Sequence, residues 1–565
     1  MPRYSAILFL LFYFLVTLCF AQDDKEGRLK AEILKYGQAE VIIPWPGEKA
    51  MDKITKYLSV SSVRDKKIYV TLSPKQAEWF LEQGFDYNIA VNESSKGVVT
   101  ASSVKQAMEW ESYPTYTQYD SIMRKFMADY PALCRLDTIG TSINGKLVMA
   151  LKISDNAAFS EPEPAVFYSS TIHGDELAGF VLMLRLADHL LKNYNTDARI
   201  KNLVDNLEIW INPLANPDGT YRSGDVISSP VRANANGIDL NRNFPDPFDP
   251  GNIPDKETID MISFMRRHRF VLSANFHAGE EVVNFPWDRW LSKYHADHDW
   301  FYYISRKYAD TVHFYSVPAY MSSFDNGVVR GCEWYVIYGG RQDFVTWELQ
   351  GREVTIELDY TRQTPAAQLG LLWLYNGQSF IGYIENALYG IYGMVSDAET
   401  SLPVPARIFI TGHDKDSSHV YSDTLTGQFT RFLSPGSWDL TFSAMGYRDT
   451  VVTGVVVSTD QRTNLQVAMT PLPNNIDTTP PQKPFLYPNP SSDFILCRLP
   501  EVITGNVRIK IINSTGVRVA DFITSGNPVT IDVRRFSPGA YLAVFKSSVS
   551  GISYSARFIV APGRH

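Results

Sequence analysis

Three side chains that suit a zinc ion follow two apolar runs of the sequence. His173 and Glu176 come directly after the apolar segment 165–170, and His277 closes the apolar segment 272–276. Imidazole nitrogens and carboxylate oxygens are common zinc ligands, and a loop at the end of a strand can aim both at one point. A histidine followed three positions later by an acid arises about once by chance in a chain of this composition, so a third ligand is needed. Taken alone, His277 is better explained as a hydrogen-bonded core histidine.

Two further features of the sequence favour a zinc site over a core histidine at position 277. Glu357 lies inside an otherwise apolar run, 354–358, where an unpaired carboxylate is costly unless it works on a metal-bound water. Arg242 lies between Asn241 and Asn243. Its guanidinium is a planar fork that suits a carboxylate.

The elements that must position these residues alternate between strands and helices from about 109 to 390. The expected strands are 165–169, 207–211, 271–276 and 354–358, and the expected helices are 177–193 and 256–268. Such alternation predicts an α/β fold with a mixed, mostly parallel sheet and helices on both faces. Sites in such folds gather at the carboxyl ends of strands, where His173 and His277 fall.

Smaller units flank this segment. Residues 22–107 are expected to hold a small α/β unit with strands at 67–72 and 87–91, a helix at 73–84 and a polar linker at about 92–103. After Gly390, short alternating β runs predict a β-sandwich of about 80 residues that ends near Pro471. A linker rich in Pro, Asn and Thr leads to a second small β unit.

The N-terminus predicts export. Arg3 precedes an apolar run, 6–20, that ends in Phe20-Ala21-Gln22, as in a secretory signal peptide cleaved after Ala21. The run is too short for a membrane span, so no transmembrane segment is expected once the signal is removed. A lipid anchor on Cys19 is disfavoured, because Leu18 stands where a small residue is needed.

The other cysteines do not form a framework. Cys134, Cys332 and Cys497 show no Cys-x-x-Cys spacing, which excludes a disulfide scaffold and a cysteine zinc knot. Each is expected to be a small buried hydrophobe, with a Cys134–Cys332 bridge as the open alternative.

Composition narrows the classes of protein further. A chain of 565 residues predicts about three or four domains. Hydrophobic residues at 45% and charged residues at 20% exclude wholesale disorder. The 53 basic and 61 acidic side chains give a net charge of −8 without a basic block, which argues against nucleic acid as a partner.

Taken together, the motifs resemble the zinc metallocarboxypeptidases of the carboxypeptidase A family, in particular the carboxypeptidase N/E (regulatory) subfamily. The resemblance covers about 280 residues, with every motif in family order, and implies the zinc carboxypeptidase fold. By similarity, His173, Glu176 and His277 bind one Zn²⁺ and leave a water in the open position. Glu357 matches the general base that deprotonates this water and then protonates the leaving amine.

The resemblance also implies the contacts to substrate. Arg232, ten residues before Arg242, falls where the subfamily has the arginine that stabilises the developing oxyanion. Asn241 and Arg242 match the pair that grips the terminal carboxylate, which implies an exopeptidase that acts on peptide or protein C-termini. Tyr335 matches the mobile tyrosine that closes on the bound substrate, whereas simple packing would explain Tyr338.

Substrate specificity follows from the same comparison. Asp288, eleven residues after His277, matches an aspartate in the pocket for the last side chain, and Gln342 matches a pocket glutamine. A buried carboxylate favours a Lys or Arg partner, because it otherwise stays unpaired. We therefore expect cleavage of C-terminal Arg or Lys. Glu280 and Glu281 stand where the family is small or apolar, and they either strengthen the basic preference or are solvated.

The flanking units have resemblances of their own. Residues 66–91 look like the end of the inhibitory pro-segment of digestive-type carboxypeptidases, although N/E members usually lack one. The unit that begins Ile391-Tyr392-Gly393 resembles the transthyretin-like domain of N/E enzymes. The last unit, with Tyr487-Pro488-Asn489-Pro490-Ser491 and Gly539-Ala540-Tyr541, resembles the sorting domain of the type IX secretion system. This implies that the type IX machinery is a partner and that the protein is released from, or held on, a Bacteroidetes-type cell.

The sequence thus predicts a secreted zinc metallocarboxypeptidase with six segments. These are a signal peptide (1–21), a pro-segment-like region with its linker (22–107), a catalytic domain (108–390), a transthyretin-like β-sandwich (391–471), a linker (472–484) and a sorting β domain (485–565). One alternative is a cell-wall peptide carboxypeptidase or amidase of the same fold, against which Asp288 argues unless the wall peptide ends in a diamino acid. The other is a noncatalytic peptide- or glycan-binding surface protein, which would require a broken site.

Overall fold

The computed structural model describes most of the chain. The described residues are 25–90, 98–248, 252–472, 484–487, 489–491, 494–500, 506–524, 529–547 and 553–561. The expected signal peptide and most of the expected linker at 472–484 lie outside them. The chain divides into two compact units, Met1–Thr470 and Pro471–His565, and each is described by itself.

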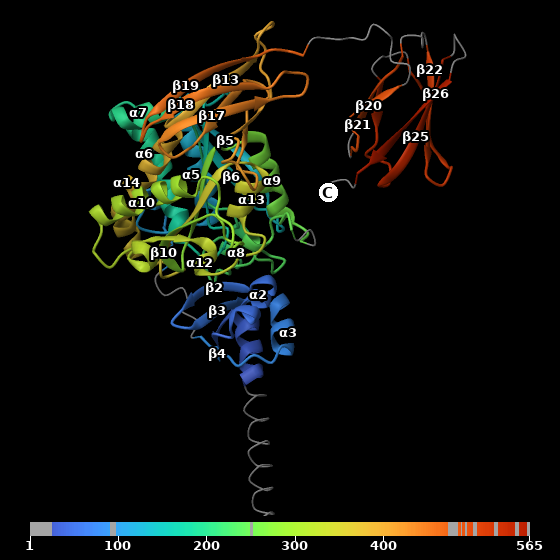
Figure 1. The fold of residues 1–565 in the computed structure, drawn as a ribbon. Coiled ribbons are helices and arrows are strands. Elements are labelled where there is room, and N and C mark those ends of the chain that lie inside the picture. The colour runs from blue at the N-terminus through green and yellow to red at the C-terminus, as the bar shows by residue number, and fades with distance from the viewer. Residues whose placement is uncertain are drawn as a thin grey trace, which may run out of the picture. The chain divides into compact units, whose positions relative to one another are not determined.

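A sheet of eight strands forms the centre of the first unit (Figure 1). Its strands are β5 (Cys134–Thr141), β6 (Leu147–Ile153), β7 (Ala165–Ser170), β8 (Glu208–Asn212), β9 (Leu272–His277), β10 (Glu280–Phe285), β11 (Val328–Arg330) and β12 (Arg352–Asp359). They lie in the order β11-β10-β12-β9-β7-β8-β6-β5. The central strands β12, β9, β7 and β8 are parallel, whereas β10 and β6 run antiparallel to their inner neighbours. This mixed sheet confirms the predicted α/β class.

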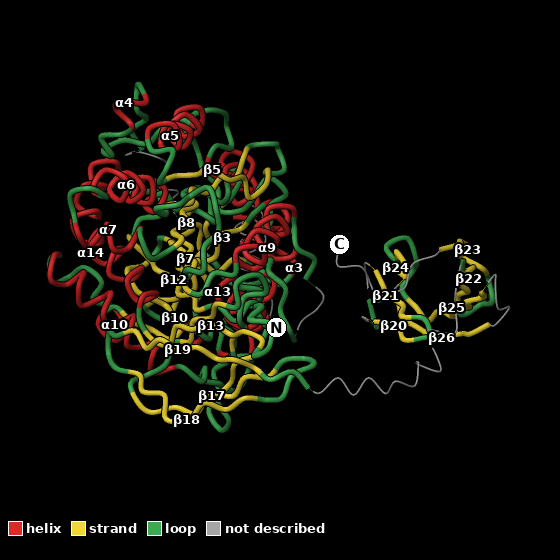
Figure 2. The backbone as a smooth tube through the Cα atoms, turned by 90° about the horizontal axis from the view of Figure 1, so that it is seen from above, coloured by secondary structure: helices red, strands yellow, loops and turns green. Residues whose placement is uncertain are grey.

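Helices cover both faces of the sheet. The helices of this domain are α4 (Val104–Ala107), α5 (Tyr116–Asp129), α6 (Ala178–Asn193), α7 (Ala198–Val204), α8 (Pro217–Thr220), α9 (Lys256–His268), α10 (His298–Tyr315), α11 (Ser323–Asn326), α12 (Gly331–Trp334), α13 (Arg341–Glu348) and α14 (Leu369–Glu385), with 3₁₀ turns η1 (Leu240–Arg242), η2 (Ala366–Gln368) and η3 (Asn386–Leu388). Figure 2 shows α6, α7, α10 and α14 along one face and α9 and α13 along the other. Each face therefore buries a separate hydrophobic core, which explains why the central strands are apolar throughout.

The predicted helix at 256–268 shows how local sequence sets its ends. The Asp255 carboxylate accepts a hydrogen bond from the Lys256 backbone N–H at the start of α9. Arg269 follows the last turn with a left-handed backbone at φ 47°. Three basic side chains, Arg266, Arg267 and His268, lie in the last turn, where they suit the negative end of the helix dipole.

A small domain precedes the one built on the eight-stranded sheet. Its elements are β1 (Ala39–Pro44), α2 (Glu48–Tyr57), β2 (Ser59–Arg64), β3 (Lys67–Leu72), α3 (Pro74–Glu82) and β4 (Asn88–Ile89), with the strands in the order β2-β3-β1-β4. The predicted strand at 67–72 is confirmed, and the predicted helix at 73–84 is confirmed as α3, which Ser73 and Gln76 begin with a capping box. The strands β1 and β2 were not predicted. The strand β2 is rich in serine and has no clear apolar alternation, whereas β1 contains the apolar run Val41-Ile42-Ile43, which could have identified it.

The domain built on the eight-stranded sheet is followed by a β-sandwich within the same unit. Its strands are β13 (Gly390–Asp397), β14 (Arg407–Phe409), β15 (Val420–Tyr421), β16 (Gln428–Arg431), β17 (Gly436–Ser443), β18 (Thr450–Val457) and β19 (Arg462–Met469). They form two sheets, β16-β13-β19 and β15-β14-β17-β18, as the alternating pattern after Gly390 predicts. Trp300 of α10 stacks on Phe432 of the sandwich at 4.7 Å between ring centroids.

The second unit is also built of β-strands. These are β20 (Phe485–Tyr487), β21 (Phe494–Arg498), β22 (Val507–Asn513), β23 (Arg518–Thr524), β24 (Val529–Asp532), β25 (Gly539–Ser547) and β26 (Ser553–Val560). They form the sheets β20-β21-β24 and β23-β22-β25-β26 around a shared apolar core. A second small β unit at the end of the chain is therefore confirmed.

Two smaller expectations are also decided by the fold. Cys134, Cys332 and Cys497 are all buried and free, so the bridge between Cys134 and Cys332 does not form. None of the helices that the structure describes combines the length and the apolarity that crossing a membrane requires.

Candidate active site

Two histidines and a glutamate converge at the carboxyl ends of β7 and β9. The two carboxylate oxygens of Glu176 lie 2.8 Å from His173 Nδ1 and 2.8 Å from His277 Nδ1. The two Nδ1 atoms lie 3.1 Å from each other. All three side chains are buried. The structure therefore brings the three predicted ligands to one point, although the loop after β7 and the end of β9 are about a hundred residues apart.

The loop that carries His173 and Glu176 is held tightly against its neighbours. Thr171 turns the chain with a left-handed backbone at φ 59°, directly before the two ligands. Gly174 approaches the backbone of Gly219 so closely that a Cβ would lie 2.4 Å from the Gly219 carbonyl carbon. A side chain at position 174 would therefore push the ligand loop away from α8.

These donors fit a zinc ion. Ligand atoms about 2.0–2.3 Å from one tetrahedral ion lie about 3.3–3.7 Å from each other, so the observed separations need only a small expansion on binding. Asp239 Oδ1 lies 3.0 Å from His173 Nε2 and can accept its proton, which leaves the Nδ1 lone pair for a metal. Asn275 Nδ2 lies 2.8 Å from His277 Nε2 and holds that ring in place.

The charge states of the three ligands follow from their burial and proximity. Burial lowers the pKa of His277 to about 4, so this imidazole is neutral at neutral pH, as a metal ligand must be. Burial opposes ionisation of Glu176, but His173 and His277 outweigh it and lower the pKa of this carboxyl well below its usual value. Burial and Arg232 lower the pKa of His173, but Glu176 and Asp239 outweigh them and raise it. A metal would replace the resulting proton.

Arg232 lies against this cluster. Its Nη1 donates to Glu176 Oε1 at 2.9 Å, and its Nε donates to Asp239 Oδ2 at 2.9 Å. The guanidinium is buried, and these bonds use only part of its donors. It therefore holds a fixed positive charge beside the cluster in a site of low dielectric.

Glu357 lies next to the cluster on the neighbouring strand. It pairs with His277 in the parallel register of β12 and β9. Its Oε2 is buried and has no hydrogen-bond partner among the described residues. Burial, and next the charge of Glu176, raise the pKa of this carboxyl well above its usual value. A carboxylate in this state readily takes up a proton.

Two residues expected to contact the substrate, Arg242 and Tyr335, contact the N-terminal domain. Arg242 Nη2 donates to the backbone carbonyl of Val60 at 3.1 Å, and the Tyr335 hydroxyl donates to the same oxygen at 3.3 Å. Arg242 Nη1 also donates to the Asn241 carbonyl at 2.9 Å. The Asn241 side chain accepts from the Arg341 backbone N–H at 3.0 Å and fixes the start of α13.

Asp288 lies in a buried polar cluster with Gln342. Its Oδ1 accepts from Gln342 Nε2 at 3.0 Å and from Asn284 Nδ2 at 3.1 Å. Burial raises the pKa of Asp288 to about 7. The Gln342 Oε1 atom is buried and has no hydrogen-bond partner in the part of the chain that the structure describes. The cluster therefore contains one buried acceptor, Gln342 Oε1, that no described residue satisfies.

Comparison with known proteins places this geometry in a family. Residues 119–378 match the family described as "Zinc carboxypeptidase". Carboxypeptidase SOL1 of Arabidopsis thaliana is 32% identical over 354 residues, which are 60% of this chain and 69% of that protein. This chain belongs to the zinc carboxypeptidase family. The resemblance read from the motifs is thereby confirmed.

Other relatives match the same part of this zinc carboxypeptidase family member. Carboxypeptidase N catalytic chain of Mus musculus is 32% identical and covers 60% of this chain and 82% of that protein. Carboxypeptidase D of Homo sapiens is 35% identical over 59% of this chain, which spans only 25% of that protein's length. Among solved structures, carboxypeptidase A from Helicoverpa armigera is 17% identical with a TM-score of 0.48, covering 62% of this chain and 97% of that one.

The two C-terminal domains of this carboxypeptidase family member also match known families. Residues 390–470 match "Carboxypeptidase regulatory-like domain", and residues 485–561 match "Secretion system C-terminal sorting domain". The predicted transthyretin-like and sorting domains are therefore confirmed.

Three site residues of this family member were missed in the sequence. Asp239 and Asn275 contact His173 and His277, and Asn284 contacts both Asp288 and Gln342. Asn275 precedes His277 by two residues on β9, so the strand period places both side chains on one face. That period could have identified Asn275, whereas the contact of Asp239 depends on a fold that joins residues 173 and 239.

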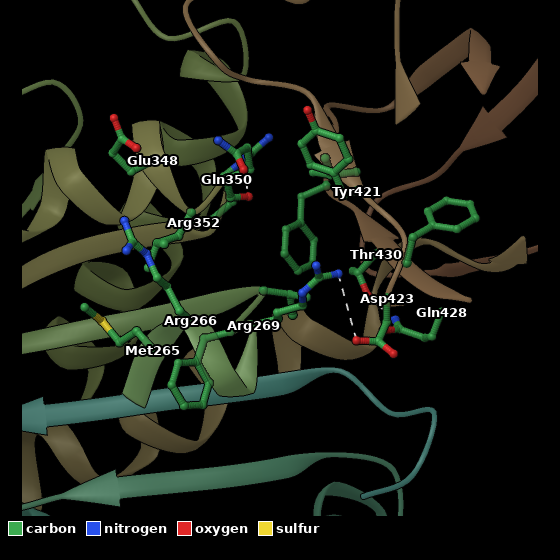
Figure 3. Close-up of a pocket in the computed structure, with 16 residues that line it drawn as sticks. Met265, Arg266, Arg269, Glu348, Gln350, Arg352, Tyr421, Asp423, Gln428 and Thr430 are labelled. Carbon is green, nitrogen blue, oxygen red and sulfur yellow. Dashed lines mark hydrogen bonds and ion pairs between the residues drawn. The ribbon is translucent and has the colours of Figure 1, made fainter. Parts of the chain in front are cut away.

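A separate cavity of about 250 Å³ lies between the catalytic domain and the β-sandwich (Figure 3). Val271 and Arg352 line it where β9 and β12 begin, at the opposite end of these strands from His277 and Glu357. Arg269 bridges it by donating to the Ser422 carbonyl at 3.1 Å. This cavity is not part of the candidate active site.

Proposed function

We propose that this chain is a secreted zinc metallocarboxypeptidase that removes C-terminal Arg or Lys from peptides or proteins. The observation that carries the proposal is the position of Glu357. Its unpartnered, buried carboxylate oxygen lies beside the cluster of His173, Glu176 and His277. A free base next to three zinc-type ligands suits hydrolysis, whereas a binding protein has no need to leave a buried carboxylate unpaired.

His173, Glu176 and His277 would hold one zinc ion, which when bound would polarise the scissile carbonyl and lower the pKa of the attacking water. Glu357 would take the proton from that water and deliver it to the leaving amine, because its Oε2 lies beside the three ligands without a hydrogen-bond partner among the described residues. Arg232 would stabilise negative charge on the carbonyl oxygen, because its guanidinium is already fixed in place.

Other residues would fix which bond is cut. Asn241 and Arg242 would bind the terminal carboxylate, and Tyr335 would close over it. Asp288 and Gln342 would bind the last side chain of the substrate. The Asp288 carboxylate needs a cation when ionised, and Gln342 Oε1 needs a donor, so a Lys or Arg side chain satisfies both.

We further propose that the N-terminal domain is an inhibitory pro-segment. The Val60 carbonyl occupies the donors of Arg242 and Tyr335 that a substrate carboxylate would use. Additional contacts hold the domain in place, including Glu40 with Arg362 at 3.0 Å and Gln38 with Asp175 at 2.9 Å. Substrate and N-terminal domain therefore compete for the same groups.

The sorting domain suggests where the enzyme acts. Residues 485–561 belong to a family described by its role in a secretion system. We propose that the type IX machinery exports the protein and that it acts outside the cell or on its surface. The expected signal peptide at 1–21 would direct the first step of this export.

The deciding experiment compares the chain with its Glu357→Gln variant, both cut after Lys96 to release the N-terminal domain. The substrates are blocked dipeptides that end in Arg, Lys, Phe or Ala, with and without a zinc chelator. We expect chelator-sensitive cleavage with preference for Arg or Lys. We expect kcat/KM to fall by about 10³ to 10⁴ in the variant while its bound zinc, measured by mass spectrometry, is unchanged.

Each other outcome is informative. Equal activity in the variant and the parent chain would contradict the role of Glu357. Preference for Phe would refute the assignment of the Asp288 pocket and leave the zinc chemistry standing. Zinc bound without turnover of any of the four substrates would favour a binding protein.

A further inference from the structure

Glu280 is a buried carboxylate on the same sheet face as the proposed base. It pairs with Asp359, and Val282 pairs with Glu357, in the antiparallel register of β10 and β12. Residues two apart on a strand point to the same side, so Glu280, Val282 and Glu357 share one face. Glu280 is only 5% exposed.

The strand β10 runs alongside the candidate active site. Asn284, at one end, donates to Asp288 in the pocket for the last side chain. Val282 lies opposite Glu357, at the place of the scissile bond. Each step of two residues advances about 7 Å along a strand. Glu280 therefore lies one such step beyond the scissile bond, on the side away from Asp288.

Under the proposed function, a bound substrate would extend in this direction. Its last side chain would occupy the Asp288 pocket and its scissile bond would lie at Glu357, so the preceding residues leave the site towards Glu280. The N-terminal domain covers this stretch as well, because the Ser61 carbonyl lies 3.8 Å from where a Cβ on Gly279 would be. Removing that domain would open the path past Glu280.

Glu280 has polar partners but no cation among the residues that the structure describes. Its Oε1 accepts from Ser323 Oγ at 3.2 Å and from the Glu281 backbone N–H at 3.2 Å. Arg362 lies near Gly279 and is paired with Glu40 of the N-terminal domain at 3.0 Å. Its Nε also lies 4.0 Å from Asp175, an acidic neighbour that stays when the N-terminal domain is removed. The neighbouring Glu357 Oε2 is also buried without a hydrogen-bond partner among the described residues, so this part of the site presents carboxyl oxygens to a substrate.

We propose that Glu280 binds a cationic side chain of the substrate upstream of the scissile bond. The enzyme would thus select C-termini that carry a basic residue before the terminal Arg or Lys. This inference rests on the proposed carboxypeptidase activity, and it adds a second point of charge recognition to that of Asp288. A substrate with an acidic residue upstream would be disfavoured by the same carboxylate.

The adjacent Glu281 provides a matched control. It pairs with Leu358, so it points to the opposite face of the sheet, into the side that holds the large hydrophobic core. Its Oε2 accepts from the Met321 backbone N–H at 3.1 Å. Replacing Glu281 by Gln removes the same charge one residue away without touching the path of the substrate.

The test measures kcat/KM of the full chain, cut after Lys96, on acetyl-Ala-Ala-Arg, acetyl-Ala-Lys-Arg, acetyl-Lys-Ala-Arg and acetyl-Ala-Glu-Arg. We expect one of the lysine peptides to exceed acetyl-Ala-Ala-Arg by about tenfold. We expect Glu280→Gln to remove this ratio and Glu281→Gln to keep it. The Kd of the same peptides for the Glu357→Gln chain should show the same order, which gives a readout without turnover.

The outcomes separate this inference from the proposed function. The role of Glu280 would be overturned if the parent chain showed no preference for the lysine peptides, or if Glu280→Gln showed the same preference as the parent chain. In either case, cleavage of acetyl-Ala-Ala-Arg would still support a carboxypeptidase. No cleavage of any peptide would count against the carboxypeptidase itself. Should Glu280→Gln fail to fold, the parent chain decides, because a charge-based lysine preference must shrink as salt rises from about 0.05 M to about 0.5 M.

Discussion

At the scale of single residues, the partners of the zinc-type ligands matter as much as the ligands. Asp239 contacts His173 Nε2 at 3.0 Å and Arg232 Nε at 2.9 Å, so one carboxylate orients an imidazole and a guanidinium together. A ligand whose second nitrogen is fixed in this way presents the correct tautomer to a metal. The site is therefore preorganised by residues that would never touch the ion.

The Asp288 pocket leads to a prediction about pH. Burial raises the pKa of Asp288 to about 7, and only the ionised carboxylate attracts a cation. As the pH rises through about 7, the ratio of kcat/KM for an Arg substrate to that for a Phe substrate should therefore increase. The measurement is this ratio between about pH 5.5 and about pH 8.5.

The effect of Glu357 ionisation on kcat/KM cancels in this ratio, because cleavage of both substrates needs the same base. The Asp288→Asn variant is the control. It should lower the ratio at high pH by about a hundredfold and make it independent of pH. A ratio that stays constant in the parent chain would show that Asp288 does not meet the substrate's cation.

At the scale of elements, one strand of the N-terminal domain contacts the candidate active site. The strand β2 carries Val60, whose carbonyl accepts from Arg242 and Tyr335. Tyr335 and Ile337 also join the apolar core of the N-terminal domain, so the segment that would close over a substrate packs against that domain instead. Polar and apolar contacts thus hold the same loop.

This arrangement predicts that cleavage activates the enzyme. Cutting the full chain after Lys96 with trypsin should raise kcat/KM on a blocked dipeptide ending in Arg by about tenfold or more, because the N-terminal domain no longer competes from within the same chain. The rise should grow on dilution, as the separated domain dissociates. The activity is measured against time alongside the appearance of the cut product on a gel.

A Lys96→Gln chain serves as the control for this experiment, since trypsin does not cut after glutamine. It should stay at the low starting rate under the same treatment for as long as the N-terminal domain remains attached. Identical rates before and after complete removal of the domain would refute an inhibitory role.

At the scale of the whole first unit, a buried ionic network joins the catalytic domain to the β-sandwich. Asp297 accepts from Arg352 Nη2 at 2.7 Å and from Arg431 Nη1 at 2.6 Å, and His413 Nε2 lies 2.9 Å away. Burial opposes ionisation of Asp297, but Arg431 and Arg352 lower the pKa of its carboxyl well below its usual value. Asp297 of the catalytic domain is thus shared by guanidinium groups from both domains, and Arg431 also donates to Asp414 of the sandwich at 2.5 Å.

Loss of this carboxylate should destabilise the unit. Asp297→Ala leaves Arg352 and Arg431 buried without their shared partner, and we expect the free energy of unfolding to fall by about 3 to 5 kcal/mol. In the zinc-loaded full chain this corresponds to a Tm lower by roughly 5 to 10 °C in a calorimetric scan.

The control is Asp299→Ala, which removes an exposed carboxylate from the first turn of α10. We expect this variant to lower the free energy of unfolding by about 1 kcal/mol or less, because the Asp299 carboxylate interacts only with the helix dipole. If Asp297→Ala and Asp299→Ala have the same Tm, the Asp297 network does not stabilise the contact between the two domains.

The sequence by itself determined the elements whose patterns are local. The helix at 256–268 and the strand at 67–72 have the predicted bounds, because capping residues and apolar periodicity act over a few residues. The predicted ligands could be named because His173, Glu176 and His277 follow apolar strands whose carboxyl ends meet in an α/β sheet.

Only the tertiary structure decided which groups complete the site. The contact of Asp239 with His173 and that of Val60 with Arg242 join residues 66 and 182 positions apart in the sequence. No local pattern encodes such pairs, because they depend on how whole elements pack. The same holds for Glu280 and Glu281, which are adjacent and identical in the sequence. The pleat of β10 turns one towards the proposed substrate path and the other towards the opposite face.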